Sequence, residues 1–172
     1  MNHSSNTNAG GWKGCDLRYD VLGSTNTNDG DATATTATNP VANTLMAALP
    51  SDLRAVMQPM TIYTDNTGGG SDNASYVTKT TDYLPLLAEY EIFGTRTYAN
   101  SAEKNYQAQY AYYSAGNSKV KYCHSSTSST AWWWERSPFC NVSGTFCIVS
   151  TDGGASSSYA RYSGGVAPAF RV

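Results

Sequence analysis

Charged residues and long apolar runs are both scarce in this chain. Lysine, arginine, aspartate and glutamate make up only 14% of the 172 residues, and the formal net charge is −2. No cluster of lysine and arginine occurs, so we expect no nucleic-acid partner. No apolar run reaches the length needed to cross a bilayer, so we expect no membrane insertion. The first residues also lack the charged and apolar regions of a signal peptide.

The residue patterns of enzymes and metal centres are missing too. The four cysteines, Cys15, Cys123, Cys140 and Cys147, match no zinc spacing, and only two histidines could assist them. We expect free thiols, with a Cys140–Cys147 disulfide as the alternative. His124 lies in a serine-rich stretch, but no nucleophile-elbow motif accompanies it. The sequence therefore predicts no enzyme, no catalytic residue, no cofactor and no bound metal.

Tyrosine, glycine and small polar residues fill much of the remaining sequence. The 13 tyrosines and 15 glycines stand among many Ser, Thr and Asn residues. This composition is typical of binding loops, in which tyrosine supplies contact area and small residues adapt around it, although an ordinary loop-rich surface would look the same. Aspartates and asparagines flank Gly68-Gly69-Gly70 and could ligate calcium, but a solvated turn is the favoured interpretation.

The first two thirds of the chain predict short helices and one hairpin. Apolar spacing favours a helix over residues 12–22 with Arg18 at its edge, and two short helices joined at Leu49-Pro50. Residues 60–64 alternate like a strand, and residues 76–78 would pair back onto it. A helix over residues 83–93 would be capped by Thr80-Thr81-Asp82, would end at Gly94, and would carry Glu89 and Glu91 on a partly solvated side.

The last third carries the strongest apolar blocks. Alternation places Trp132 and Trp134 on one face of a strand and Trp133 on the other, which suits a central strand. Val120 and Tyr122 predict a further strand, and a short helix is expected near the tyrosines of residues 106–113. These elements together indicate a single α+β domain over residues 1–172, rich in loops.

Several blocks resemble the DUF6273 family when they are taken together. They are Gly10-Gly11-Trp12 with Arg18, Leu49-Pro50-Ser51-Asp52-Leu53, residues 86–94, Trp133-Trp134-Glu135-Arg136-Ser137-Pro138 and Gly165-Val166-Ala167-Pro168-Ala169-Phe170. The resemblance runs nearly end to end. It implies an origin in gut bacteria or their bacteriophages, and a C-type lectin-like fold with short helices around a small, twisted, mostly antiparallel sheet. It also implies similarity to the variable proteins of diversity-generating retroelements.

In such retroelements, a reverse transcriptase with errors at template adenines rewrites codons near the C-terminus. The resemblance therefore implies a variable region at about residues 123–163 that displays side chains to a protein or glycan ligand on a cell surface. The protein would act in a virion, at a tail or fibre tip, or on a bacterial cell surface. A homo-trimer would suit a fibre tip. The alternative is a non-variable structural or assembly module of a phage tail or cell envelope.

The residue types near the C-terminus agree with this mechanism. Adenine substitution at an Asn codon cannot yield Lys, Glu, Gln, Met or Trp, and none of these five residues occurs from Phe139 to Val172, although all occur earlier. Residues 123–130 stay within the reachable set as well. A third class of function, an enzyme like the formylglycine-generating relatives of lectin-like folds, would need a reactive cysteine pair, and Cys140 and Cys147 match no such motif.

A rewritten surface requires that its variable side chains do not support the core. The expected supports are Trp133, Trp134, Arg136, Pro138, Phe146, Val149, Val166, Pro168 and Phe170. The expected ligand-binding residues are Phe139, Asn141, Ser143, Thr145, Ser150, Thr151, Asp152, Ser156, Ser157, Ser158, Tyr159, Arg161 and Tyr162. Aromatic and arginine side chains dominate binding hot spots, so Phe139, Tyr159, Arg161 and Tyr162 should contribute most. For Arg136 we expect bonds to loop carbonyls or to a carboxylate.

Overall fold

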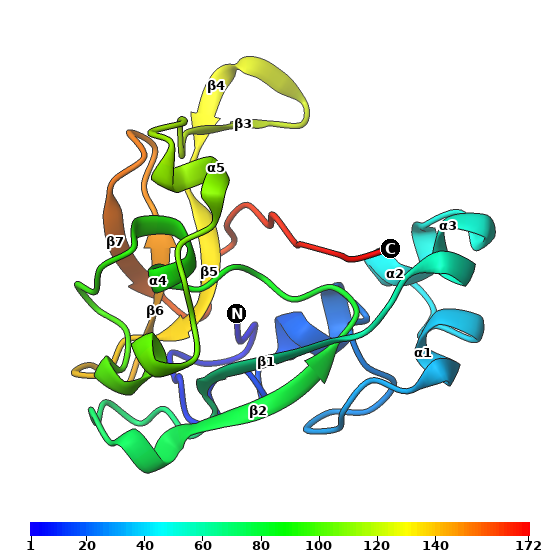
Figure 1. Cartoon of the computed structure of the whole chain (residues 1–172), viewed down its shortest axis with the longest axis horizontal. Coiled ribbons are helices and arrows are strands. Elements are labelled where there is room, and N and C mark those ends of the chain that lie inside the picture. Colours follow the sequence, from blue (N-terminus) through cyan, green and yellow to red (C-terminus); the bar gives the residue numbers. More distant parts are fainter.

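The computed structural model describes residues 1–172 and consists of short helices and antiparallel strands (Figure 1). In chain order the elements are η1 (Leu17–Val21), α1 (Ala34–Thr38), α2 (Leu45–Ala48), α3 (Ser51–Val56), β1 (Met60–Asp65), η2 (Ala74–Tyr76), β2 (Val77–Asp82), α4 (Glu89–Phe93), η3 (Ser101–Asn105), α5 (Ala111–Ser114), β3 (Lys121–Cys123), β4 (Ser126–Ala131), β5 (Trp133–Pro138), β6 (Thr145–Val149) and β7 (Ala155–Tyr159). The strands form three separate antiparallel sheets, β1-β2, β3-β4 and β5-β6-β7. The predicted α+β domain with short helices is confirmed.

The β5-β6-β7 sheet is covered on both faces. Trp134, Phe146 and Ile148 belong to the larger hydrophobic cluster, which the N-terminal half of the chain builds around Trp12. Trp133 belongs to a smaller cluster on the side of α4 and α5. The predicted alternation of the tryptophans is therefore confirmed, and Trp132 packs against the larger cluster, with its ring 5.0 Å from that of Trp134.

β5 lies at one edge of this sheet, so the prediction of a central strand is wrong. Its outer edge is closed by other segments instead of by a strand. The amide of Trp134 donates to the carbonyl of Gly165 at 2.9 Å, and the amide of Arg136 donates to the carbonyl of Leu87 at 2.9 Å. Because these segments satisfy the backbone, β5 is buried along its whole length without a second neighbouring strand.

The hairpin β1-β2 and the break at Pro50 follow the sequence prediction. Met60 pairs with Asp82 at the open end, and Asp65 pairs with Val77 beside the glycine turn. Pro50 separates α2 from α3, because proline has no amide hydrogen to continue a helix. Asp65, which was expected in a solvated turn, is buried. Its carboxylate accepts hydrogen bonds from the amide of Gly68 at 2.7 Å and from Asn100 at 2.9 Å.

The helix predicted over residues 83–93 is only its last turn, α4. Pro85 lies inside the apolar run and excludes a helix there, so residues 83–88 are not helical. The supposed cap at Thr80-Thr81-Asp82 belongs to strand β2. α4 instead begins where the carboxylate of Glu91 accepts from the amide of Ala88 at 2.9 Å. It ends, as predicted, at Gly94 with a φ of 70°.

The helix predicted over residues 12–22 is also shorter, because only Leu17–Val21 is helical. Its bond from the amide of Leu22 to the carbonyl of Leu17 at 2.9 Å gives it the wider turn of a π-helix. Arg18 is buried, not at the edge, and its Nε donates to the carboxylate of Asp82 at 2.6 Å. None of the helices has both the length and the apolar character that a membrane-spanning helix needs.

Candidate ligand-binding surface

The scaffold beneath the C-terminal surface is fixed by Arg136 of β5. Its guanidinium donates to the Glu91 carboxylate at 2.6 and 2.7 Å, to the Leu86 carbonyl at 2.8 Å and to the Thr64 hydroxyl at 2.6 Å. Burial alone would lower the pKa of Arg136, but the charge and hydrogen bonds of Glu91, together with the nearby Glu103 carboxylate, raise it overall. Arg136 thus makes both predicted kinds of bond. Glu91 is buried with it, as is Glu89, which corrects the expectation of a partly solvated helix side.

The loop after β5 holds three of the predicted ligand-binding residues. The side-chain amide of Asn8 donates to the carbonyls of Phe139 and Val142 at 3.1 and 2.9 Å, which fixes the loop backbone. Asn141 and Ser143 are exposed on this anchored loop. Phe139 is half-buried, with its ring edge-on to that of Tyr98 at 5.0 Å. The loop therefore presents two small polar side chains, while Phe139 is partly used in packing.

Three residues were assigned to the wrong group, either to the residues that support the core or to those that face a ligand. Thr145 was expected on the surface but is buried, because it starts β6, the central strand of the sheet. Val166 and Phe170 were expected as supports, yet their side chains are 39% and 51% exposed. The segment that carries them runs from the β5 edge of the sheet to the region of α2 and α3 (Figure 1), and its backbone pairs with the body of the domain at Gly165 and Arg171.

The serines of β7 occupy the other edge of the sheet. Ser156, Ser157 and Ser158 pair with β6 on one side only, and all three are half-buried. In the turn before them, Ser150 and Gly154 both donate to the carboxylate of Asp152. The bond from Ser150 is the main cause of the lowered pKa of Asp152. Thr151 and Asp152 are exposed in this closed turn.

Tyr159, the last residue of β7, forms a compact exposed group with Arg161 and Tyr162, which follow the strand. The two tyrosine rings meet edge-on with centroids 5.7 Å apart, and the Arg161 guanidinium lies 6.0 Å from the centre of the Tyr162 ring. Both tyrosines are about half exposed, at 49% and 47%. This group offers aromatic area together with a positive charge, a combination that is frequent at binding hot spots.

The predicted residues divide between two ends of the β5-β6-β7 sheet. Thr145 pairs with Tyr159 at one end, and Val149 pairs with Ala155 at the other, next to the Ser150–Asp152 turn. Five strand residues span about 13 Å, so the two groups do not touch one another through this sheet. After Ala160 the chain crosses from the β7 edge to the β5 edge, where Gly165 pairs with Trp133.

This crossing segment, residues 163–166, separates two depressions of the surface. The first, which we call the hairpin groove, has a volume of about 810 Å³ and lies between the β3-β4 hairpin and the crossing segment. Its lining includes Tyr122, His124, Thr130, Trp132, Thr151 and Ser163. The hairpin projects from the body of the domain at the top of Figure 1. The volume of the hairpin groove lies within the range of about 300–1,000 Å³ that is usual for small-ligand sites.

Thr151 is the one residue of the hairpin groove among the ligand-binding residues named from the sequence, although His124, Thr130 and Ser163 also fall within the predicted variable region of residues 123–163. Trp132 lines the groove, and the absence of a side chain at Gly164 lets the chain approach this ring. A Cβ at Gly164 would lie 2.1 Å from the Trp132 ring. Tyr122 and His124 belong to β3 and its turn, where only the small polar composition of residues 123–130 hinted at exposure.

The second depression, which we call the N-terminal hollow, has a volume of about 260 Å³. Arg161 and Tyr162 line it from the C-terminal side, and His3 and Asp16 line it from the N-terminal side. His3 and Asp16 also belong, with Asp20, to the one group of side chains in the chain that could hold a metal ion. Arg161 and Tyr162 thus lie across a common depression from possible cation ligands, an arrangement the sequence did not predict.

The cysteines are free thiols, as expected, and no disulfide joins Cys140 to Cys147. Cys15, Cys140 and Cys147 are buried. Burial raises the pKa of Cys15 to about 12 and raises the pKa of the other two as well. Because the thiolate is the reactive form, burial suppresses thiol chemistry at all three positions.

The framework also contains a carboxyl group without a partner. Glu135 is fully buried, and neither of its oxygens has a hydrogen-bond partner. Burial, followed by the nearby carboxylates of Glu89 and Glu103, raises its pKa well above the ordinary value. Burial also raises the pKa of Glu103 to about 7, although this carboxylate accepts bonds from the Asp65 amide and the Ser137 hydroxyl. Burial without a hydrogen-bond partner therefore favours the neutral form of the Glu135 carboxyl group.

A family model described as "Domain of unknown function (DUF6273)" matches residues 1–172, so the chain belongs to this family. No curated protein shows a significant match to the chain. No solved structure shows one either. The family thus identifies the domain but names no activity.

Proposed function

We propose that this DUF6273 domain is a ligand-binding display domain with a C-type lectin-like fold, and that it is the variable protein of a diversity-generating retroelement. Its ligand would be a protein or glycan on a cell surface. It would act from a phage tail or fibre tip, or from a bacterial surface. The region of variation would be residues 123–163.

The hairpin groove is the observation that carries this proposal. Two stretches lack the residue types that adenine substitution cannot produce, residues 123–130 and residues 139–172. They are separated in sequence by the tryptophan block, yet both line the same groove, through His124 and Thr130 on one side and Thr151 and Ser163 on the other. If two separate variable stretches are selected for binding one ligand, they should border the same depression of the surface.

The side chains that stabilise the fold are different from those that are exposed, and this difference supports the proposal as well. Trp133, Trp134, Arg136 and Phe146 are each at most 1% exposed, whereas Tyr159, Arg161 and Tyr162 are exposed. Substitutions at exposed positions usually change the free energy of unfolding by no more than about 0.5 kcal/mol. Many combinations of side chains could therefore occupy the surface without unfolding the domain.

Sequencing of this locus across independent cell or phage lineages tests the proposal. We expect amino-acid differences to concentrate at codons 123–163 and to arise at adenines of a nearby near-copy of this region, beside a reverse-transcriptase gene. Codons 132–134 serve as the internal control, because a tryptophan codon contains no adenine. Codons 1–122 provide a second control within the same gene.

Two results would contradict the proposal. One is a uniform locus without a near-copy or reverse transcriptase. The other is variation spread evenly over the whole gene, including the codons of buried framework residues such as Phe146.

One observation favours the alternative, a non-variable assembly module. An apolar groove of about 730 Å³ lies outside the region of proposed variation, and it is lined by Tyr110, Tyr112 and Phe170 among others. All three of these side chains are exposed. Exposed aromatic surface of this kind is typical of protein contacts. A uniform locus, together with loss of assembly in a Tyr112→Ser variant, would support this module over the variable binder.

A further inference from the structure

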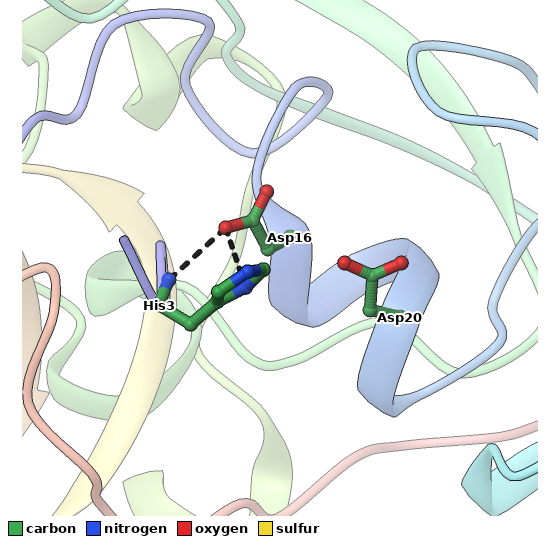
Figure 2. A group of neighbouring side chains, drawn as sticks. All are labelled: His3, Asp16 and Asp20. Carbon is green, nitrogen blue, oxygen red and sulfur yellow. Dashed lines mark hydrogen bonds and ion pairs between the residues drawn. The ribbon is translucent and has the colours of Figure 1, made fainter. Parts of the chain in front are cut away.

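Three side chains that can ligate metals come together beside the N-terminal hollow (Figure 2). The Nδ1 atom of His3 lies 2.9 Å from Oδ2 of Asp16. One donor atom each of His3, Asp16 and Asp20 lie within 4.8 Å of one another. Asp20 has no ion-pair partner, so two neighbouring carboxylates share a single imidazole.

Two of the bonds that hold the backbone carrying these side chains involve none of the three candidate donor groups, whereas a third, from the amide of His3 to Oδ2 of Asp16 at 3.0 Å, uses one of them (Figure 2). The amide of Asn2 donates to the carbonyl of Ala160 at 2.8 Å, which ties the N-terminal segment to the body of the domain. The amide of Asp16 donates to the side-chain oxygen of Asn2 at 3.1 Å. Because His3 follows Asn2 directly, its position relative to Asp16 is set before any ion binds.

The π-helix η1 places the two aspartates on one side. Asp16 immediately precedes the helix and Asp20 lies four residues later, close to one full turn. Figure 2 shows Asp16 and His3 pointing toward one another, with Asp20 next along the same helix. The donors therefore come from two segments, the N-terminal segment and η1.

We propose that His3, Asp16 and Asp20 form a binding site for a divalent transition-metal ion of the zinc class. One imidazole nitrogen and two carboxylate oxygens suit zinc, whereas calcium and magnesium prefer oxygen ligands alone. Two carboxylates balance the charge of the ion. Three protein ligands leave one coordination position open to water or to a group from outside the chain.

The distances require only small side-chain movements. Zinc bonds of 2.0–2.2 Å place tetrahedral donors about 3.4 Å apart, and the donor atoms now lie within 4.8 Å of one another. The His3 side chain is 74% exposed, so its ring is free to turn. The ion would take the place of the contact between Nδ1 of His3 and Oδ2 of Asp16.

The positive charge of Arg161 is the main opposing feature, because it lines the same hollow. Its guanidinium lies over the Tyr162 ring and forms no ion pair with either aspartate. The open coordination position and Arg161 thus border one depression. The metal site does not rest on the proposed display function, since none of its three ligands lies in residues 123–163.

Calorimetric titration of the full chain, with any affinity tag removed, with zinc chloride in a non-chelating buffer tests the site. We expect one ion per chain for the unaltered protein. Removal of even an outer partner of a metal ligand costs about 10–100-fold in affinity, so His3→Gln and Asp20→Asn should each weaken binding at least about tenfold. His124→Gln, which removes the only other histidine, and Asp152→Asn are matched controls that should bind as the unaltered chain does.

Visible absorption of bound cobalt provides a readout of the ligand set, and it should be lost in His3→Gln and kept in His124→Gln. Circular dichroism should show all four variants folded, because all four side chains lie at or near the surface. The proposal is overturned if zinc at millimolar concentration does not bind, or if His3→Gln binds as tightly as the unaltered chain. It is equally overturned if calcium displaces zinc at equal concentration.

Discussion

β4 and β5 follow one another in the chain with only Trp132 between them, yet their surroundings are opposite. None of the six residues of β4 is buried, and the strand pairs with β3 alone. All six residues of β5 are buried, including an arginine and a glutamate. The same secondary structure thus occurs once in a projecting hairpin of Ser and Thr residues and once as a strand that is buried along its whole length (Figure 1).

The difference shows which contacts determine the tolerance of each strand to substitution. β4 is held mainly by backbone bonds, which almost any side chain permits. β5 depends on the identity of its side chains, because each fills space or pairs a charge inside the protein. Trp132 marks the change, since it is half-buried and touches both the core and the hairpin groove.

The largest effect should come from breaking the buried ion pair of β5. Arg136→Met leaves the Glu91 carboxylate buried without its partner, and loss of one partner of a buried pair costs about 3–5 kcal/mol. Arg161→Met is the matched control in the exposed region, and it should change the free energy of unfolding by less than about 0.5 kcal/mol. Urea unfolding measures both. Equal losses for the two variants would contradict the contrast between β5 and the surface.

A second, smaller effect concerns the buried carboxyl of Glu135 and depends on pH. Its raised pKa means that the folded protein keeps this proton after the unfolded chain has released it. As pH rises above about 4.5, the wild type should therefore lose about 1.4 kcal/mol of stability per pH unit until the folded-state pKa is reached. Glu135→Gln cannot ionise, so its stability relative to the wild type should increase with pH.

Urea unfolding of Glu135→Gln and wild type at pH 4.5, 6 and 8 measures this difference. Glu103, whose pKa is raised to about 7, adds a similar slope to both proteins, so it largely cancels in the comparison. Asp152→Asn is the control variant. It also removes one carboxylate, but this one lies in an exposed turn and its pKa is lowered, not raised. A stability difference between Glu135→Gln and wild type that stays constant over this range would show that Glu135 is ionised in the folded protein.

Sequence patterns correctly predicted the elements that are determined by neighbouring residues. The tryptophan alternation, the break at Pro50, the β1-β2 hairpin and the end of α4 at Gly94 were all readable from neighbouring residues. The helix over residues 83–93 failed because the apolar spacing was given more weight than Pro85. That error shows that a single proline prevents a helix even where the apolar spacing favours one.

Features that depend on distant residues could not be predicted in the same way. Arg18 and Asp82 are 64 positions apart, and Arg136 and Glu91 are 45 apart, so their burial as pairs leaves no local signal. The hairpin groove likewise joins residues of separate stretches. Thr145 was misassigned because its small polar side chain resembles its exposed neighbours, whereas its place on the central strand β6 is a property of the sheet.

The smallest effect is expected for Tyr159, at the end of β7, and Tyr162. Tyr159→Ser with Tyr162→Ser removes two half-exposed rings that meet edge-on, so the free energy of unfolding should change by no more than about 1 kcal/mol for the pair. Tyr113→Ser makes the same chemical change at a ring buried beside Trp133, where the loss should be about 3 kcal/mol. Thermal unfolding compares the two proteins directly. If the exposed pair destabilises the domain as much as Tyr113→Ser does, these tyrosines belong to the framework, and the surface they form is not free to vary.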